Sequence, residues 1–195
     1  MQIISTRQQF IADHSSTNYL FYAAKPLSKE ARAYANTLSS HVDVGSRTAQ
    51  ITYHGDFADL GEERRRKFLT YYDVEVRESY DWWTLSVRLE AEKVVKINLK
   101  EYETECESSL TLERYGKSIC LRFEGWHLDS SAAYGEFGEK VMEGLAELGI
   151  KLRAELYAGK TAALKVVQVY CAENRILEDA NSALARMLAE ILEVI

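Results

Sequence analysis

WWTLSVRL, residues 82–89, is the stretch of this sequence that decides the fold. Side chains alternate between the two faces of a β-strand. The stretch therefore predicts a strand with one wholly apolar face and one mixed face. The apolar face would hold Trp83, Leu85, Val87 and Leu89, and the mixed face would hold Trp82, Thr84, Ser86 and Arg88.

Further strands are predicted on both sides of this stretch. Residues 74–76 begin the strand before it, and alternation over residues 95–99 predicts a strand after it. Residues 109–123 predict a hairpin around Tyr115 and Gly116. Successive antiparallel strands usually pair with their neighbours in the sequence, so we expect this block to form a meander.

A strand–helix–strand unit precedes the block. Residues 18–25 are rich in β-forming side chains. Ser28 is a candidate N-cap for a helix whose apolar stripe includes Tyr34. Residues 48–54 alternate between apolar and polar side chains, which predicts a half-buried strand.

The spacing of Asp59 and Glu62 resembles a capping box and predicts a helix to about Tyr72. The basic run Arg64–Lys67 lies on this helix, directly after two glutamates. Four consecutive helical residues point around most of the helix, which favours a solvated face with local ion pairs. Contact with RNA or phosphate through the run Arg64–Lys67, with Arg64 and Arg65 as binding residues, is the alternative.

After residue 128 the pattern becomes helical. One apolar stripe runs from Phe137 to Leu152, a second helix follows Gly159, and a third is predicted over residues 178–193. We therefore predict one α+β domain over residues 1–195, in which the N-terminal unit joins an antiparallel sheet of about five to seven strands. The three-helix C-terminal segment packs on that sheet. The chain ends at Ile195 without a helix stop signal, so a docked or shortened end is expected.

Composition places the chain among globular proteins. Of its 195 residues, 47% are hydrophobic, and the net charge is −6. The acidic balance argues against a duplex DNA binder, because DNA affinity comes largely from neutralised phosphates. The N-terminus lacks the apolar core of a secretory signal, and no apolar run is long enough to span a membrane.

The three cysteines, Cys106, Cys120 and Cys171, form no CxxC pair. Reduced, buried thiols in a cytoplasmic protein are therefore expected. Cys120 lies within an apolar strand, which favours packing over reactivity. Gly159-Lys160-Thr161 resembles part of a phosphate-binding loop, but the full GxxxxGK[ST] pattern and its preceding strand are missing.

Three histidines occur in a His-x-Asp pattern. Positions i and i+2 share a face of a strand, so such pairs could together hold a divalent metal that activates water. The alternative is that each aspartate caps a turn after its strand. The metal hypothesis rests on His54, Asp56, His127 and Asp129, with His41 and Asp43 as the third pair.

Tyr80, Trp82 and Arg88 are the aromatic binding candidates. Consecutive tryptophans in a strand must point to opposite faces, so one serves the core and Trp82 lies on the mixed face beside Arg88. An exposed tryptophan near an arginine is a typical anchor for a partner protein. The alternative is that helices of this chain cover that face as well.

The chain also resembles a family of uncharacterised bacterial proteins, which implies an architecture and no chemistry. The resemblance covers the first 90 residues and the segment after residue 145. It is carried by YLFY at 19–22, KPLS at 25–28, LSS at 38–40, YHGDF at 53–57, YYD at 71–73, the strand ending VRL at 87–89, and LRAELYAG at 152–159.

These observations favour a non-catalytic, cytoplasmic protein-interaction module in a bacterium, such as an inhibitor, an immunity protein or a chaperone-like adaptor. The acidic balance suits a basic protein partner. Self-association is a further option. Two alternatives are a metal-dependent hydrolase that uses the His-x-Asp pairs and an RNA-binding accessory protein. Only the hydrolase would need a cofactor, a divalent metal.

Overall fold

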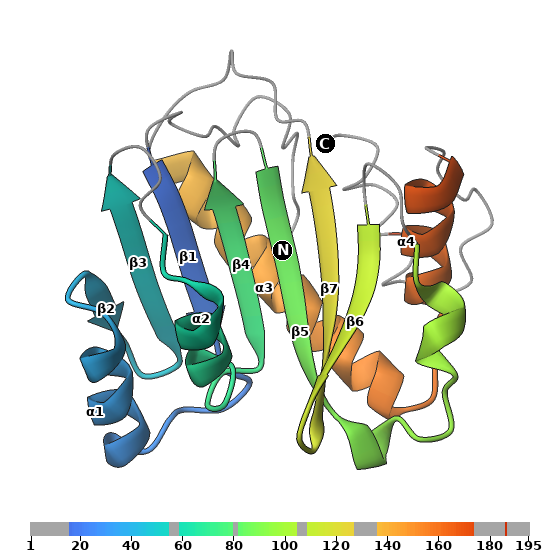
Figure 1. The fold of residues 1–195 in the computed structure, drawn as a ribbon, viewed down its shortest axis with the longest axis horizontal. Helices are drawn as coiled ribbons and strands as arrows, with labels where there is room; N and C mark the ends of the chain where they lie inside the picture. Colours follow the sequence, from blue (N-terminus) through green and yellow to red (C-terminus); the bar gives the residue numbers. More distant parts are fainter. Residues whose placement is uncertain are drawn as a thin grey trace.

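The protein is described here by a computed structural model that covers residues 16–54, 59–79, 82–104, 109–126, 136–173 and 186. Seven strands form one antiparallel sheet in the order β2-β3-β1-β4-β5-β7-β6 (Figure 1). The strands are β1 (Ser16–Tyr22), β2 (Val42–Val44), β3 (Thr48–His54), β4 (Val74–Ser79), β5 (Trp82–Glu90), β6 (Ser109–Tyr115) and β7 (Ser118–Trp126). The helices are α1 (Lys29–Leu38), α2 (Glu62–Phe68), α3 (Glu136–Tyr157) and α4 (Ala162–Glu173), with two short 3-10 helices, η1 (Ala91–Lys93) and η2 (Leu99–Tyr102).

The predicted α+β class is confirmed. The sheet has seven strands, and helices follow it late in the chain, as the change of pattern after residue 128 predicts. The third predicted C-terminal helix, 178–193, lies outside the described residues. Among the described helices, none is long and apolar enough to cross a lipid bilayer.

The strand order departs from the expected meander. β1 lies between β3 and β4, and β7 rather than β6 pairs with β5. The β6–β7 hairpin forms as predicted around Gly116, which has a φ of 58° that favours glycine. β7 then pairs with β5 from Trp82↔Trp126 to Glu90↔Ser118, along the full length of both strands. The longer strand of the hairpin therefore takes the inner position and leaves β6 at the edge.

The prediction of a strand over residues 95–99 is wrong. After β5 the chain forms η1 and η2 instead. Val94 and Leu99 are buried, whereas Val95 is 78% exposed, so the apolar side chains do not all face one way. Over so short a run, alternation does not distinguish a strand from successive tight turns.

The predicted capping box is also wrong. α2 begins at Glu62 and ends at Phe68, well before Tyr72. Its N-cap is Gly61, with a φ of 76°, and no side chain caps the helix. Asp59 contacts the sheet instead, as described below. In a capping box the cap residue is a polar residue with extended backbone, here predicted to be Asp59. The cap residue is instead Gly61, two positions later, whose backbone has a positive φ.

Other local predictions are confirmed. Ser28 caps α1, since its hydroxyl accepts a hydrogen bond of 3.2 Å from the Ala31 N–H. The strand predicted over 48–54 is β3. Gly159, with a φ of 75°, separates α3 from α4, so it ends a helix rather than opening a phosphate loop.

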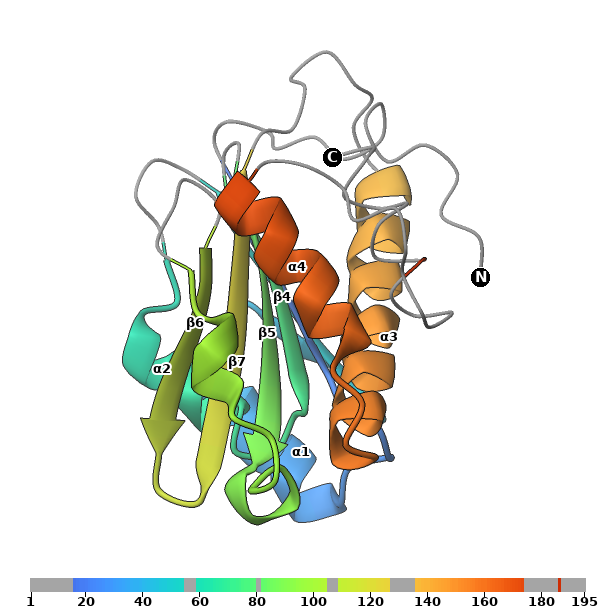
Figure 2. The same ribbon diagram turned by 90° about the vertical axis from the view of Figure 1, so that its right-hand side faces the viewer.

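Helices cover both faces of the sheet. α3 and α4 lie on one side, called here the back face, and α1 and α2 lie on the other, the front face (Figures 1 and 2). The alternation predicted for β5 is confirmed, because all four residues of its apolar face are buried in the back core. That core combines strand residues with the inner sides of both helices, among them Trp83, Leu85, Val87, Leu89, Leu121, Leu145, Leu152 and Leu164.

Gly149 sets how closely α3 approaches the sheet. A Cβ at this position would lie 2.8 Å from Cγ1 of Val74 and 3.2 Å from Cδ1 of Leu85. Carbon atoms in contact lie about 3.5–4.0 Å apart, so there is no room for a side chain. The glycine therefore allows the helix backbone to rest directly on β4 and β5.

Gly149→Ala is expected to destabilise the protein by about 1–3 kcal/mol, because the added methyl group forces the helix and the sheet apart. This would occur although alanine is the better helix former by about 1 kcal/mol. Urea unfolding of both proteins measures the difference. Exposed Ala154 on the same helix provides the control, since Ala154→Gly reports helix propensity alone. A Gly149→Ala variant more stable than the wild type would contradict the close-approach argument.

Candidate functional site

The front face of the sheet changes character between β1 and β5. Over β1 and β3 it is apolar, and Phe21 stacks on Phe68 of α2 with ring centroids 4.4 Å apart. Over β4, β5, β7 and β6 the front-facing residues are mostly polar. This polar half-face is defined here by Glu75, Arg77, Thr84, Ser86, Glu113 and Arg122.

A buried ion pair anchors α2 to the polar half-face. Arg65 Nε lies 2.5 Å from Glu75 Oε1, and Arg65 Nη2 lies 3.2 Å from Oε2. The Glu75 side chain is fully buried, and only 8% of the Arg65 side chain is exposed. Burial lowers the pKa of Arg65, but the charge and hydrogen bonds of Glu75 outweigh it and the net shift is upward. The guanidinium therefore stays charged, and the two-point contact fixes the position of α2 over β4.

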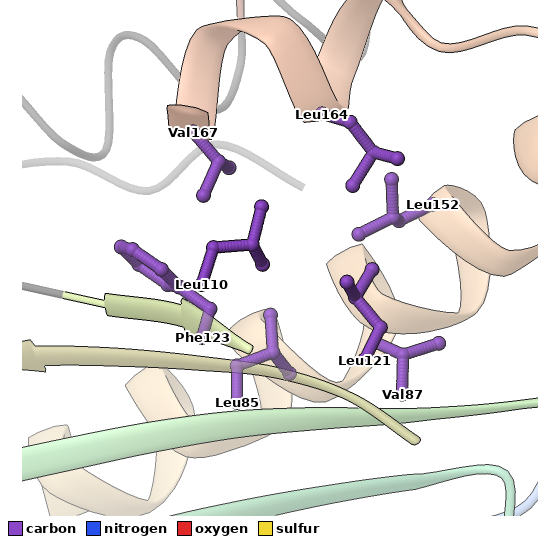
Figure 3. Close-up of a pocket in the computed structure, with 8 residues that line it drawn as sticks. All are labelled: Leu85, Val87, Leu110, Leu121, Phe123, Leu152, Leu164 and Val167. Atoms are coloured by element: carbon purple, nitrogen blue, oxygen red, sulfur yellow. The ribbon is translucent and has the colours of Figure 1, made fainter. Parts of the chain in front are cut away.

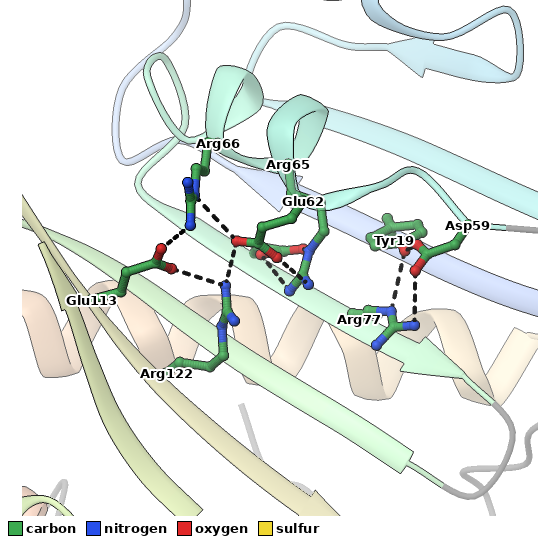
Figure 4. A network of polar contacts seen from close by, with 9 residues as sticks. Tyr19, Asp59, Glu62, Arg65, Arg66, Arg77, Glu113 and Arg122 are labelled. Carbon is green, nitrogen blue, oxygen red and sulfur yellow. Dashed lines mark hydrogen bonds and ion pairs between the residues drawn. The ribbon is translucent and has the colours of Figure 1, made fainter. Parts of the chain in front are cut away.

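Glu62, in the first turn of α2, extends the network across the sheet (Figure 4). It accepts hydrogen bonds from Arg65 Nη1 at 3.0 Å and from Arg122 Nη2 at 2.9 Å. Arg66 lies 3.5 Å from Glu62 and also pairs with Glu113 of β6. With the buried pair, three arginines meet three carboxylates, so the charges of the network cancel.

Asp59 makes a separate contact at the same face. It accepts a hydrogen bond from the Tyr19 hydroxyl, and Arg77 Nη2 lies 3.4 Å from its other oxygen. Arg77 Nε in turn donates to the Tyr19 hydroxyl at 3.1 Å. Instead of capping α2, Asp59 ties the segment before the helix to β1 and β4.

Cys120 is fully buried on the front of β7. Burial raises the pKa of its thiol to about 11, so the group is protonated at neutral pH. Because the thiolate is the reactive form, this cysteine is inert. The sequence-based prediction that Cys120 packs in the interior is confirmed.

The polar half-face is built to bind its own helix. Glu62, Glu75 and Glu113 each form an ion pair with an arginine. Among the described residues of this face, the charged groups are thus committed to structural contacts.

Two of the predicted binding residues are also held in internal contacts. Arg65 pairs with Glu75, as described above. Arg88 Nη2 lies 2.6 Å from Asp73 Oδ1, and Arg88 Nε donates to the Tyr72 carbonyl at 3.1 Å. Arg153 of α3 reaches the same Asp73 oxygen at 3.0 Å, so Arg88 belongs to a contact that joins α3 to the sheet.

Of the three remaining binding candidates, Arg64, Tyr80 and Trp82, the structure describes the side chain of Arg64 alone. Arg64 is exposed on α2. Tyr80 lies outside the described residues, and for Trp82 the structure describes the backbone, within β5, but not the side chain. The aromatic anchor at Tyr80 and Trp82 stays a prediction.

The residues of the metal hypothesis are described only in part. His54 is exposed at the end of β3, and Asp56, His127 and Asp129 lie outside the described residues. Within the described ranges, no three histidine, cysteine or acidic residues gather as a metal site would require. The hypothesis that His54 and His127 share a metal stays untested.

Two exposed tyrosines form a feature that the sequence did not reveal. Tyr34 of α1 is 39% exposed and Tyr71, after α2, is 37% exposed, with ring centroids 5.4 Å apart. Lys67 lies close enough to Tyr34 and Arg64 for their charges to affect its pKa. These four residues are called the α1–α2 patch. The spacing of Tyr34 predicts a place in the buried stripe of α1. α1 packs mainly against β2 and α2, and Tyr34 lies at an edge of the helix that this packing leaves exposed.

The back core contains a small cavity between β5, β6, β7, α3 and α4 (Figure 3). Its volume is about 10 Å³, roughly what one water molecule requires. Eight apolar side chains line it: Leu85, Val87, Leu110, Leu121, Phe123, Leu152, Leu164 and Val167. A cavity this small and apolar is a packing gap rather than a ligand site.

Comparisons with known proteins give no family for this chain. No protein-family model matches it, and a search of curated proteins finds no match. The resemblance to uncharacterised bacterial proteins therefore stays a prediction.

Glu75→Gln should destabilise the protein by up to about 3–5 kcal/mol at pH 7, because it removes the buried carboxylate and leaves the Arg65 guanidinium only the partly exposed Glu62 as a counter-charge. Urea unfolding measures this loss. Glu63→Gln is the matched control on α2, since Glu63 is 84% exposed and its one ion pair within the described ranges is with Lys67, and it should leave the midpoint unchanged. Equal midpoints for both variants would contradict the role of the buried pair.

The contribution of Glu62 to stability should depend on pH. Burial raises its pKa, but the hydrogen bond from Arg122 and the charges of Arg65, Arg122 and Arg66 outweigh this, and the pKa falls below 4.5. A lowered native pKa stabilises the fold above the unfolded value, and the effect is lost as pH falls through the native value.

The unfolding free energies of wild type and Glu62→Gln should therefore differ most at pH 6–7 and converge in acid below pH 4.5. Denaturant titrations at several pH values test this. Glu92→Gln, at an exposed position on η1, should track the wild type throughout. A difference that is the same at every pH would show that the charge of Glu62 is not responsible.

Proposed function

We propose that this protein is a non-catalytic protein-interaction module of the bacterial cytoplasm, of the kind found among inhibitors, immunity proteins and chaperone-like adaptors. The observation that carries the proposal is the exposed pair of tyrosines in the α1–α2 patch. Tyrosine and arginine are enriched among the residues that dominate binding energy in protein interfaces. The proposed module needs no cofactor.

The two rings are suited to act as one anchor. They come from different elements and contact each other, so each restricts the movement of the other. A partner that covers them would lose less side-chain entropy than with two isolated tyrosines. Arg64 is exposed on α2 and lies near Lys67 of the same patch. These three side chains supply apolar area, hydroxyl groups and one charge to a partner.

The edges of the sheet support a partner site on the helices rather than a strand-addition site. Leu110 N–H of the edge strand β6 donates to Thr104 Oγ1 at 3.0 Å, and Leu112 N–H donates to Glu103 Oε1 at 3.1 Å. The Leu110 carbonyl accepts from Thr104 N–H at 2.9 Å. The other edge strand, β2, has three residues. Short or blocked edges disfavour pairing with another chain.

Charge gives a preference for the partner. The chain carries a net charge of −6, which favours encounter with a basic protein over long range. The same sign disfavours duplex DNA. RNA contact through Arg64 and Arg65 is the weaker candidate, because the guanidinium of Arg65 is buried against Glu75. Self-association through the tyrosines is the other form that a protein partner could take.

The double variant Tyr34→Ala/Tyr71→Ala should lose partner binding without losing the fold. The wild type, immobilised on resin, would capture partners from a bacterial extract, and the captured protein would then be titrated against both forms. Loss of a binding anchor worth about 2 kcal/mol or more raises the dissociation constant about thirtyfold.

Val95→Ala is the matched control, since Val95 is the third exposed large apolar residue among those described and lies between η1 and η2 rather than on α1 or α2. It should bind as the wild type does. Circular dichroism would check that the double variant is folded. Size-exclusion chromatography of the wild type would distinguish self-association from a different partner. Equal affinity of the double variant and the wild type would reject the α1–α2 patch as the binding surface.

A further inference from the structure

Two neighbouring polar atoms inside the polar half-face lack hydrogen-bond partners. Ser86 Oγ and Arg122 Nε are both buried, and neither meets a donor or acceptor within the described residues. Ser86 is fully buried as a residue. Ser86 and Arg122 are direct cross-strand partners on β5 and β7. Such groups are rare in native proteins, because each gives up its hydrogen bonds to water on folding.

Side chains of α2 bracket this position. On one side, Ser86 is the cross-strand partner of Glu75, which Arg65 binds. On the other side, Arg122 binds Glu62. The space over Ser86 is therefore flanked by two ion pairs that α2 makes with the sheet. This placement keeps the site away from bulk water.

We propose that Ser86 and Arg122 bind one internal water molecule between β5 and β7. Side chains directly opposite each other in an antiparallel pair have Cβ atoms about 4.5–5.5 Å apart. Both side chains therefore rise from neighbouring positions on the same face, and one water with two hydrogen bonds of about 2.8 Å can join polar atoms that are too far apart to bond directly. Its oxygen accepts from the Arg122 Nε–H, which can only donate, and it exchanges a hydrogen bond with the Ser86 hydroxyl, which can do both.

The charge of the network selects a neutral ligand. Arg65, Arg66 and Arg122 are already matched by Glu62, Glu75 and Glu113. An anion at this position would bury a negative charge without compensation, and a cation would face the N–H of Arg122. Water satisfies both polar atoms without changing the balance of charge.

The sign of the effect of Ser86→Ala tests the proposal. If the hydroxyl had no partner, its removal would leave stability unchanged or higher, because an unpaired buried polar group disappears. If it holds the water, removal should lower the folding equilibrium constant about five- to tenfold. Ser109→Ala is the matched control on the front of β6, where the serine is partly exposed, and it should have little effect. Equal or greater stability of Ser86→Ala overturns the proposal.

A crystal structure at about 1.5 Å resolution provides the direct measurement. We expect a water within hydrogen-bond distance, roughly 2.6–3.2 Å, of both Ser86 Oγ and Arg122 Nε, and its loss or displacement in Ser86→Ala. A soak in sodium bromide distinguishes a neutral from an anionic ligand. An anomalous bromide peak at the site overturns the assignment of water, as does a direct protein hydrogen bond to Ser86 Oγ with no water present.

Discussion

The contact of α3 with the back of β4 and β5 is the constraint on which the rest of the structure depends. Gly149 lets the helix backbone rest on Val74 and Leu85. At that separation nothing polar fits between helix and sheet, so the back-facing positions of these strands must be apolar and closely matched in shape. α4 closes the same core further along, leaving a gap no larger than a water molecule. Because α3 and α4 cover only the back of the sheet, the front-facing residues of the same strands are covered by other elements, α1 and α2.

The helices contact the front face through two kinds of interaction, one apolar and one ionic. Beneath α1 and across β1 and β3 the contact is apolar and includes stacked Phe21 and Phe68. From β4 outward it is ionic, with Arg65 buried against Glu75. An apolar contact alone would tolerate several orientations of a helix as short as α2. A buried, two-point ion pair favours one orientation, because any other leaves an uncompensated charge inside the protein.

The internal contacts of the polar half-face limit which residues can contact another molecule. The carboxylates and arginines of the polar half-face are occupied with one another, and the Cys120 thiol is held in its protonated form. The edge strands present short or blocked backbone. The proposed contact surface is the pair of exposed tyrosines of the α1–α2 patch, whose rings pack against each other.

The sequence by itself determined the features that depend on near neighbours. Alternation assigned Trp83 and its companions to the core, Ser28 capped α1, and Gly116 turned the hairpin, because each follows from the geometry of a few consecutive residues. Alternation failed over 95–99, where the run was too short to separate a strand from two 3-10 turns. The fold class could be predicted, but of the α1–α2 patch the sequence singled out the basic residues Arg64 and Lys67 and neither of the tyrosines.

Tertiary structure alone decided which strand lies beside β5, which arginine of the run from Arg64 to Lys67 is buried, and which tyrosines stay exposed. Arg65 and Arg64 are adjacent and chemically identical, so only the position of Glu75 across the interface separates a structural residue from a surface one. Tyr34 and Tyr71 lie far apart in the chain, and no local pattern links them. Their contact exists because α1 and α2 pack side by side on the front of one sheet, and long-range packing of that kind leaves no signal in a short window of sequence.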